Sequence, residues 1–498
     1  MARSLFLAVA LSYLLSVSAS SLSDAAAVCQ ELQSSLSSAS AVFYPNSTEY
    51  VYDTTLPASF FNRANATCVV EPGSNEDAAL VMTSIRNHNQ APFGVMGWGH
   101  NLNKLFSSTT GVLVALNRFN QLNITDAPGP NNQVALVNVG PGLSWDQVYA
   151  KTVPQGVNVV GGRFATVGVS GLSLGGGYSW ISNEHALACD NVASYTLISP
   201  NDSSILEVNN STYPDLFFAL KGGLNNFGIV TNFQLQGYNQ TNKVWAGTVY
   251  TQPGNSDAVA AAFANFSVNN TDPKAQLIGT FAYGNNSAFE IIVLFYNGEE
   301  EPTMFNDFLS LPQSQPTDWS LRTFDNFTSA SLATVGFLNG GRTRYSTLAV
   351  EGFPTSVVQS FQSQRDALGP KLNALDPKFF GSWTIEPFIQ SYWDTAVPSA
   401  APHSSAHVTF PPNIEFTWYT AQNDDIMFDT ISNTTQALVN SALAAGQNVS
   451  DQIIYPNYAM PQVPVEHFYG DNLPRLRQIR SDIDPYNVMS RAGGYKIN

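Results

Sequence analysis

Two nearly continuous apolar stretches in the middle of the chain predict a pair of neighbouring strands. Residues 275–284 and 288–297 are rich in β-branched and aromatic side chains, a composition typical of strands. A turn around Gly284, Asn285 and Asn286 separates them, and glycine and asparagine accept the backbone angles of tight turns. We therefore expect the two stretches to lie side by side.

Shorter patterns of the same kind lie nearer the N-terminus. Residues 111–120 and 132–142 alternate or run apolar between turn residues, which indicates strands. Residues 75–91 instead place their apolar side chains at helical spacing, so they predict an amphipathic helix. We expect Asn75 or Glu76 near its start.

A later stretch, residues 413–421, alternates between polar and apolar side chains and predicts a strand with two different faces. The polar face comprises Asn413, Glu415, Thr417 and Tyr419, and the apolar face comprises Ile414, Phe416 and Trp418. A polar strand face of this kind is able to line a pocket.

Two glycine-rich stretches, residues 94–101 and 159–180, stand out from these patterns. So many glycines weaken any regular helix or strand, whereas successive N–H groups in glycine turns form concave sites for phosphates. The two stretches are able to hold the phosphates of a dinucleotide. Neither fits the Rossmann fingerprint, and no Walker A sequence occurs. From composition alone, plain turns remain an equal alternative.

The N-terminus has the features of a secretory signal. Arg3 precedes the apolar run LFLAVALSYLLSV, and small residues around Ala19 offer a cleavage site. The chain contains 13 Asn-x-Ser/Thr acceptor sites, which predicts a glycosylated surface. An oxidising compartment favours one disulfide, and Cys29 and Cys68 are the expected pair because both lie in the N-terminal segment. Cys189 then remains a free thiol.

Charge and composition exclude several functional classes. The formal net charge is −16 and the pI is near 4.6, which argues against a nucleic-acid partner. After the N-terminal run no segment has about eighteen uninterrupted apolar residues, so we expect no membrane span. The spacing of cysteine and histidine residues indicates no metal site.

Five ordered motifs resemble a known family, the FAD-linked oxidases of the vanillyl-alcohol-oxidase type. They are GVMGWGHN at 94–101, the long glycine-bearing stretch 137–180, DNVASYTLIS at 190–199, PDLFFALKGGLNNFGIVTNFQL at 214–235, and the tail 455–490, which begins YPNYAM. The tail resembles the C-terminal element of the berberine-bridge-enzyme-like branch. The region between about 236 and 450 resembles the family only loosely, as a substrate region does.

The resemblance implies an α+β fold. A two-part FAD-binding domain of the PCMH type would carry an inserted α/β substrate domain with an antiparallel sheet. The expected organisation is a signal peptide at 1–19, an FAD-binding domain at 20–235, a substrate-binding domain at 236–450 and a berberine-bridge-like segment at 451–498 that returns to the FAD domain.

In this family, the histidine of the first glycine loop is joined to the 8α-methyl carbon of FAD. Here that residue is His100. Trp98 stands where a glycine is common, and Phe164 stands where bicovalent members carry a cysteine in the second loop. We therefore expect one covalent bond, through His100. The further cofactor contacts implied by the motifs are Gly97, Gly99, Asn101, Thr166, Val167, Gly168, Gly171, Gly175, Gly228, Ile229, Val230 and Asn457.

Oxidation by a flavin requires a group that takes the proton released with the hydride. Tyr458 matches the tyrosine proposed as this base in several related oxidases, and Asn457 is expected to contact the edge of the flavin ring. A free phenol has a pKa of about 10, so we expect cationic or hydrogen-bonding neighbours to lower the pKa of Tyr458. Glu415 and Tyr419, on the polar strand face, are rival acid–base candidates.

The sequence thus favours a secreted FAD oxidase that acts on a small organic molecule, an alcohol or a secondary-metabolite intermediate. Dioxygen would reoxidise the flavin, and we expect a monomer with no nucleic-acid or membrane partner. One alternative is a carbohydrate oxidase. Another is a flavin-bearing scaffold for cyclisation without net redox change, which peroxide release would distinguish from both oxidases.

Overall fold

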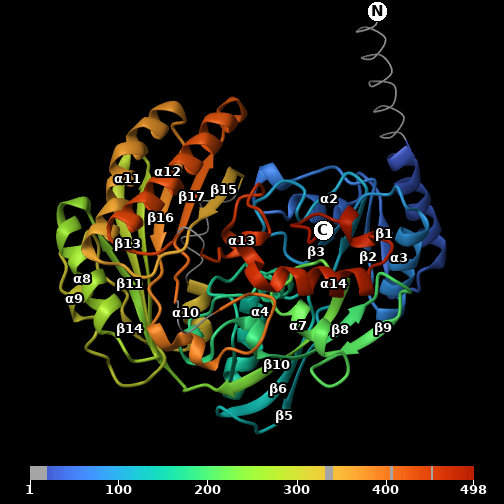
Figure 1. Cartoon of the computed structure of the whole chain (residues 1–498), viewed down its shortest axis with the longest axis horizontal. Coiled ribbons are helices and arrows are strands. Elements are labelled where there is room, and N and C mark those ends of the chain that lie inside the picture. The colour runs from blue at the N-terminus through green and yellow to red at the C-terminus, as the bar shows by residue number, and fades with distance from the viewer. Residues whose placement is uncertain (1–19, 331–339, 404–407, 450–451) are drawn as a thin grey trace, which may run out of the picture.

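The strands form three sheets in the computed structural model, which describes residues 20–330, 340–403, 408–449 and 452–498 (Figure 1). Two smaller sheets lie in the N-terminal half of the chain, and a larger one lies in the following part. The mixed α+β architecture that the sequence predicts is confirmed.

The first sheet has four strands in the order β1-β2-β4-β3. Its strands are β1 (Ala41–Phe43), β2 (Cys68–Glu71), β3 (Phe93–Met96) and β4 (Val112–Ala115). Strands β2, β4 and β3 run parallel. A disulfide joins Cys29 to Cys68 and Cys189 is a buried free thiol, so the predicted pairing is confirmed.

Helix α3 (Asn75–Asn87) connects β2 to β3. Ser74 caps it, because the Ser74 hydroxyl accepts a hydrogen bond from the backbone N–H of Asp77 at 3.1 Å. Val81 and Ile85 lie on its buried face. The helix predicted over 75–91 is confirmed, with its end four residues earlier.

The second sheet is antiparallel and is built around β10 (Ile229–Asn239), which pairs with β6, β7 and β8. Its remaining strands are β5 (Leu122–Asp126), β6 (Gln133–Val139), β7 (Val157–Val159), β8 (Val192–Ile198) and β9 (Ile205–Val208). The strands predicted within 111–120 and 132–142 are β4 and β6, in two different sheets.

The third sheet has seven antiparallel strands in the order β14-β11-β13-β12-β16-β17-β15. They are β11 (Val244–Thr251), β12 (Ala275–Gly284), β13 (Ser287–Tyr296), β14 (Ser320–Arg322), β15 (Arg342–Thr347), β16 (Phe380–Ile385) and β17 (Asn413–Trp418). The predicted pair is the hairpin β12–β13. Asn285 and Asn286 have φ values of 50° and 57°, which a two-residue hairpin turn of this kind requires.

Helices cover the outer face of this sheet (Figure 1). They are α8 (Ser256–Asn269), α9 (Asn306–Leu309), α11 (Thr355–Leu375) and α12 (Asp424–Ala444). Phe281 and Ile292 of the sheet pack in one core with Phe263 of α8 and Phe361 of α11. Their neighbours along β12 and β13 point the other way, since side chains alternate, and this second face is the one that lines the site described below.

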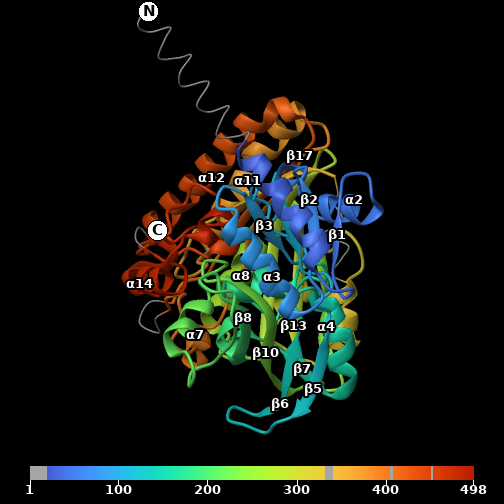
Figure 2. The same ribbon diagram turned by 90° about the vertical axis from the view of Figure 1, so that its right-hand side faces the viewer.

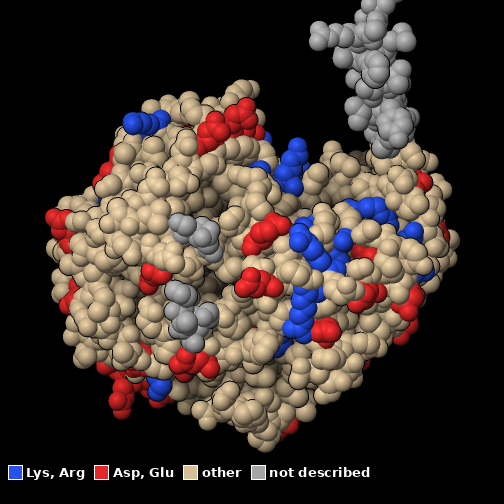
Figure 3. All heavy atoms as spheres, in the orientation of Figure 1, with Lys and Arg blue, Asp and Glu red and all other residues tan. Residues whose placement is uncertain are grey.

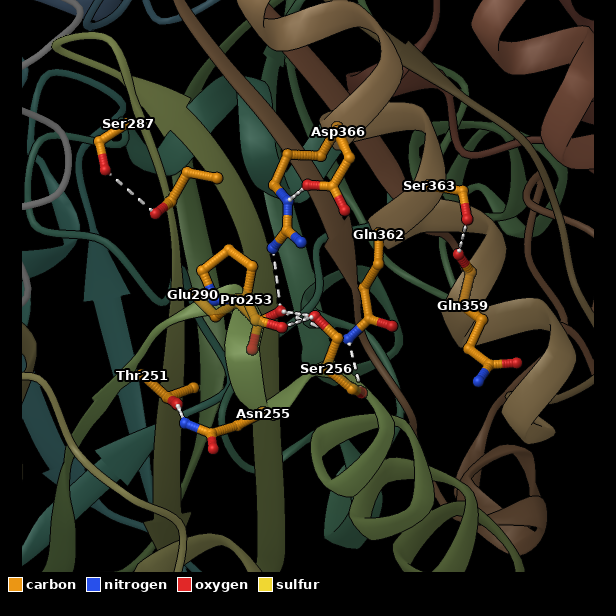
Figure 4. Close-up of polar contacts among 12 residues, drawn as sticks. Thr251, Pro253, Asn255, Ser256, Ser287, Glu290, Gln359, Gln362, Ser363 and Asp366 are labelled. Atoms are coloured by element: carbon orange, nitrogen blue, oxygen red, sulfur yellow. Dashed lines mark hydrogen bonds and ion pairs between the residues drawn. The ribbon is translucent and has the colours of Figure 1, made fainter.

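A buried ion pair joins α11 to the outer face of the sheet. Arg365 Nη1 lies 2.9 Å from Glu290 Oε1, and both side chains are fully buried. The Gln362 amide and the Ser256 hydroxyl also donate to Glu290 (Figure 4). Burial raises the pKa of Glu290, although Arg365 beside it acts in the opposite direction. The pair holds the helix in one register on the sheet.

The C-terminal segment returns to the N-terminal half. Helix α14 (Leu473–Ile483) packs Leu476 into one core with Phe218 of α7 (Pro214–Leu220), and both views place α14 beside α7 (Figure 2). The remaining helices are α2 (Thr48–Thr55), α4 (Trp145–Thr152), α5 (Val169–Leu174), α6 (Ser182–His185), α10 (Phe324–Ala330) and α13 (Glu466–Tyr469).

Basic side chains gather in a band over the C-terminal segment, whereas acidic side chains are scattered over the same face (Figure 3). Two arginines of this segment form ion pairs. Arg475 pairs with Asp215 of α7, and Arg477 pairs with Glu466. Across the described ranges, no helix is both long enough and apolar enough to cross a membrane.

Candidate active site

A cavity of about 320 Å³ lies between the two glycine loops and the inner face of the seven-stranded sheet. Its walls come from the 94–101 loop, the 163–178 segment, the 224–230 segment, strands β12, β13, β15, β16 and β17, and the tail. The N-terminal half, the large sheet and the C-terminal segment therefore all contribute to one site.

The first glycine loop follows β3 directly and is closely packed. A Cβ at Gly97 would lie 2.4 Å from the Ser170 hydroxyl oxygen and 3.1 Å from the Pro141 carbonyl oxygen, so little space is left there, and the φ of +65° at Gly99 favours glycine. The Trp98 indole donates a hydrogen bond of 2.8 Å to the carbonyl oxygen of Gly142. The tryptophan that departs from the family pattern thus anchors the loop.

His100 lies at the end of this loop and lines the cavity. Its Nε2 atom is buried and has no hydrogen-bond partner. Burial lowers the pKa of His100 to about 4, so the imidazole is neutral at physiological pH. A neutral ring nitrogen with a free lone pair is what attachment to a cofactor carbon requires.

The second glycine loop leads into α5 and faces the first. Phe164, Val167, Gly168 and Gly171 line the cavity. A Cβ at Gly168 would lie 2.9 Å from the Trp98 side chain, so the two loops touch.

Two predicted contacts of the second loop differ from expectation. Thr166 lies outside the cavity lining, and Gly175 lines a second cavity of about 170 Å³ beside the main one. A Cβ at Gly175 would lie 2.3 Å from the Asn457 amide oxygen. Close packing against the tail therefore explains this glycine.

The far end of the cavity is formed by the start of β10. Gly228, Ile229 and Val230 line it, together with Tyr495 of the tail. Gly228 has a φ of +140°, and a Cβ there would lie 2.4 Å from the Ile198 carbonyl oxygen. The structure thus brings these three residues to the same cavity as His100 and Asn101.

Near the sheet, two buried side chains and one half-buried side chain form a connected polar group. The Arg163 Nη2 atom donates to Glu386 Oε2 at 2.5 Å and to the Tyr458 hydroxyl at 3.0 Å, and this hydroxyl donates to Glu386 Oε1 at 3.1 Å. The Arg163 and Glu386 side chains are 3% and 2% exposed. All three residues line the cavity, although they lie far apart in the sequence.

The predicted cation beside Tyr458 is therefore present as Arg163, but the expected direction of the pKa shift is wrong. Burial, followed by the neighbouring Glu386, raises the pKa of Tyr458 well above its ordinary value, and the opposing effect of Arg163 is smaller. Burial alone would lower the pKa of Arg163, but Glu386 and Tyr458 raise it overall. The resting state is a neutral phenol between an arginine and a carboxylate.

Asn457 also lines the cavity. Its amide donates to the Tyr455 hydroxyl at 2.9 Å. The Tyr455 ring in turn stands edge-on to Tyr458 and to Tyr178, with centroid separations of 4.9 and 4.8 Å. These aromatic contacts hold the tail segment against the cavity.

The two rival acid–base candidates on β17 are separated by the structure. Glu415 lines the cavity, and its Oε1 atom is buried without a hydrogen-bond partner. Burial raises the pKa of Glu415 to about 8, and the Thr417 hydroxyl opposes this shift. Tyr419 follows the last residue of β17, is 39% exposed and lies outside the cavity lining. The structure therefore brings one of the two rival candidates, Glu415, to the cavity, because β17 ends before Tyr419.

Three buried polar atoms of the described cavity lining have no partner: His100 Nε2, Arg163 Nη1 and Glu415 Oε1. Leaving a buried polar atom unpaired costs about 1–3 kcal/mol, so these atoms indicate a ligand. The histidine is at the glycine loops and the other two are near the sheet. Glycine loops, apolar walls and an unpaired imidazole are the groups that would hold an FAD.

Sequence reasoning missed Arg163, Glu386 and Tyr455 as site residues. Arg163 lies inside the second glycine loop. Its positive charge among glycines was the feature that could have identified it as a site residue. Glu386 follows β16 in the stretch TIEPF, which carries no pattern of its own. Arg163 and Glu386 lie 223 residues apart in the sequence, so no local pattern predicts their contact.

Two known protein families match segments of the chain that contribute residues to this site. The family described as FAD binding domain matches residues 66–209, and the family described as berberine and berberine like matches residues 454–491. These ranges contain His100, the second glycine loop and Tyr458.

Two curated relatives extend the match. An uncharacterized FAD-linked oxidoreductase of Arthroderma benhamiae is 32% identical over 279 residues, which cover 55% of this chain and 54% of that protein. The chain therefore aligns with about half of that relative's length. The FAD-dependent monooxygenase drtC of Aspergillus calidoustus is 28% identical over 458 residues, covering 87% of this chain and 83% of that protein.

Among solved structures, Physcomitrella patens BBE-like 1 superposes with a TM-score of 0.75 at 17% identity, covering 93% of this chain and 97% of that one. At this identity the likeness establishes the fold. The predicted fold class, with a PCMH-type FAD-binding domain, is confirmed.

Proposed function

Since the chain belongs to the FAD-linked oxidoreductases of the vanillyl-alcohol-oxidase type, in their berberine-bridge-enzyme-like branch, we propose that it is a secreted oxidase of a small organic molecule. The substrate class is an alcohol or a secondary-metabolite intermediate, and dioxygen is the final electron acceptor. The observation that carries this proposal is that three residues lining one cavity, His100, Arg163 and Glu415, each have a buried side-chain atom without a hydrogen-bond partner.

His100 would hold FAD through one covalent bond at a ring nitrogen. Its neutral, unpartnered Nε2 supports this role. Phe164 lines the cavity where a second tether would need a cysteine, which supports a single bond. Bound there, FAD would supply the hydride acceptor.

The protein residues would manage the proton. As the hydride leaves the substrate carbon, the Tyr458 oxygen accepts the proton of the substrate hydroxyl, and the proton of Tyr458 passes to Glu386 Oε1 at 3.1 Å. Tyr458 thus stays neutral before and after the transfer. Arg163 fixes both partners and stabilises negative charge during the transfer.

Secretion and a monomeric state are further parts of this proposal. The N-terminal segment that resembles a signal lies outside the described residues. The Cys29–Cys68 disulfide supports an oxidising compartment. Secretion is tested by detecting the glycosylated protein in the medium of expressing cells. The monomeric state is tested by measuring the molar mass with light scattering.

The test of the cofactor proposal is acid precipitation of the purified protein. Flavin colour should stay with wild-type chains and appear in the supernatant from His100→Ala. Phe164→Ala is the matched control, since it removes a neighbouring cavity side chain and should retain the colour. Release of all flavin from the wild type would contradict the covalent bond.

A monooxygenase is the second candidate, because relatives such as drtC carry that name. An oxidase releases hydrogen peroxide, whereas a monooxygenase places one oxygen atom of dioxygen in the product and the other in water. Turnover under ¹⁸O₂ distinguishes them by product mass. A carbohydrate oxidase would release peroxide with sugars, and a cyclisation scaffold would release none.

A further inference from the structure

The inner face of the seven-stranded sheet changes from apolar to polar across the cavity. Ile278, Ile291 and Val293 of β12 and β13 form its apolar side. Thr280, Ser382, Thr384, Asn413 and Glu415 form its polar side, on β12, β16 and β17. The register places Ser382 opposite Glu415, and Thr384 opposite both Thr280 and Asn413. A molecule bound on this face would contact apolar side chains at one end and hydrogen-bonding side chains at the other.

Glu415 differs from Glu386, the other carboxyl group of the described cavity lining, in having no cation paired with it. Its cross-strand neighbours are Ser382 on β16 and Tyr345 on β15, and neither carries a positive charge. Arg163, the one arginine or lysine of the described cavity lining, is already held by Glu386. A buried carboxyl group without a cation is stabilised as the neutral acid, and the raised pKa of Glu415 agrees with this.

A neutral carboxylic acid has an O–H that donates. Glu415 lines the cavity and its Oε1 atom has no hydrogen-bond partner, so the protein leaves a donor of this carboxyl group unused. Arg163 Nη1, the other unpaired atom near the sheet, is also a donor. Two unused donors beside an apolar surface select a ligand with acceptor oxygens and without charge.

We propose that Glu415 recognises the substrate by donating a hydrogen bond, as a neutral acid, to a carbonyl oxygen, so that the enzyme acts on uncharged carbonyl-bearing molecules with an apolar end. This inference rests on the proposed function for the location of the substrate. It assigns Glu415 to specificity and leaves the proton transfer to Tyr458 and Glu386. Ammonium-bearing and carboxylate-bearing molecules are disfavoured at this position.

Three probes of similar size test the inference: acetophenone, which offers a carbonyl oxygen, cumene, which offers none, and 1-phenylethylammonium, which is charged. Their dissociation constants are measured by titration calorimetry with the intact protein at pH 7 and pH 9. With a pKa of about 8 for Glu415, acetophenone should bind about tenfold more weakly to wild type at pH 9 than at pH 7, because the donor is lost on ionisation.

The variant Glu415→Gln separates the ionisation of Glu415 from the ionisation of other groups as the cause of the pH dependence. Glutamine keeps a donor and does not ionise, so acetophenone affinity should change less than twofold between the two pH values. Lys496, whose pKa burial lowers to about 7, contacts Asn225 at the other end of the cavity and is unchanged in this variant. Burial raises the pKa values of Tyr345 and Tyr458, so these phenols do not titrate in this range.

A second variant, Glu415→Leu, removes the donor. If it folds, the preference for acetophenone over cumene should fall about tenfold at pH 7. Acetophenone binding to wild type that is equal at pH 7 and pH 9, or tighter binding of the ammonium probe at pH 7, would overturn the inference. The titrations need neither turnover nor a covalent flavin, so failure of the proposed oxidase reaction would be seen separately, in the acid precipitation and peroxide measurements.

Discussion

Two buried arginine–glutamate pairs, one at the cavity and one behind the sheet, have the same chemistry and different surroundings. Arg163–Glu386 lines the cavity and holds the Tyr458 hydroxyl between its members. Arg365–Glu290 lies between helix α11 and the outer face of the sheet, outside the cavity lining. Both pairs are almost completely inaccessible to solvent.

The comparison teaches that a buried ion pair does not by itself mark a functional site. The pair behind the sheet is surrounded by Gln362, Ser256 and Asp366, which belong to the helices that pack there (Figure 4). The pair at the cavity is connected instead to a titratable hydroxyl on a third segment. Function is expected where the hydrogen-bond network of a buried pair reaches a cavity, and stability where the network joins only the elements packed around the pair.

The largest effect is expected for Tyr458→Phe, which removes the hydroxyl held by the cavity pair. The rate constant for anaerobic flavin bleaching by substrate should fall about 10²–10⁴-fold, as is typical for loss of a general base. Ring volume is kept, so the free energy of unfolding and the attachment of flavin should be unchanged. A rate constant within about threefold of wild type would remove Tyr458 from the mechanism.

Arg365→Met should break the pair behind the sheet. It should lower the free energy of unfolding and leave the rate of flavin bleaching unchanged. It leaves Glu290 buried without its cation, which costs about 3–5 kcal/mol of unfolding free energy in urea titrations. Without Arg365 the pKa of Glu290 rises further, so the acid is neutral when folded and ionised when unfolded. The loss should therefore grow as pH rises from about 4 towards 8.

Arg365→Met protein that remains folded should bleach its flavin at the wild-type rate. A slower rate at unchanged stability would mean that the pair behind the sheet also serves the reaction, and the contrast between the pairs would fail.

Glu386→Gln should give an intermediate result, because this carboxylate belongs to both an ion pair and the proton path. Flavin bleaching should slow by about 10–100-fold, less than for loss of the base itself. The unfolding free energy should fall by about 1–3 kcal/mol, since the amide still accepts a hydrogen bond from Arg163. Unchanged bleaching would assign Glu386 to structure alone and make the two pairs equivalent.

The smallest effect is expected for Tyr419→Phe. The side chain is 39% exposed and lies outside the cavity lining, so stability should change by less than about 0.5 kcal/mol. Flavin bleaching should remain within about twofold of wild type. A larger fall in rate would show that the cavity extends beyond the end of β17.

The sequence predicted most of the local elements and about half of the site. The hairpin at 275–297, the helix from Asn75 and the Cys29–Cys68 disulfide follow from turn residues, helical spacing and cysteine position. The motifs also located the loop residues around His100 and the tail around Tyr458 at one cavity. Thr166 lies outside that cavity because its short loop turns only some side chains inward.

What the sequence by itself determined is therefore local: which segments become strands, helices and glycine turns, and that two of those turns approach a cofactor. Only the tertiary structure decided that Arg163 meets Glu386, that Glu415 stays without a cation, and that Tyr419 lies beyond the end of its strand. The physical reason is that periodicity and turn chemistry depend on near neighbours. The charge state of a buried group depends instead on side chains that folding brings from distant segments, such as Glu386 and Tyr458 beside Arg163.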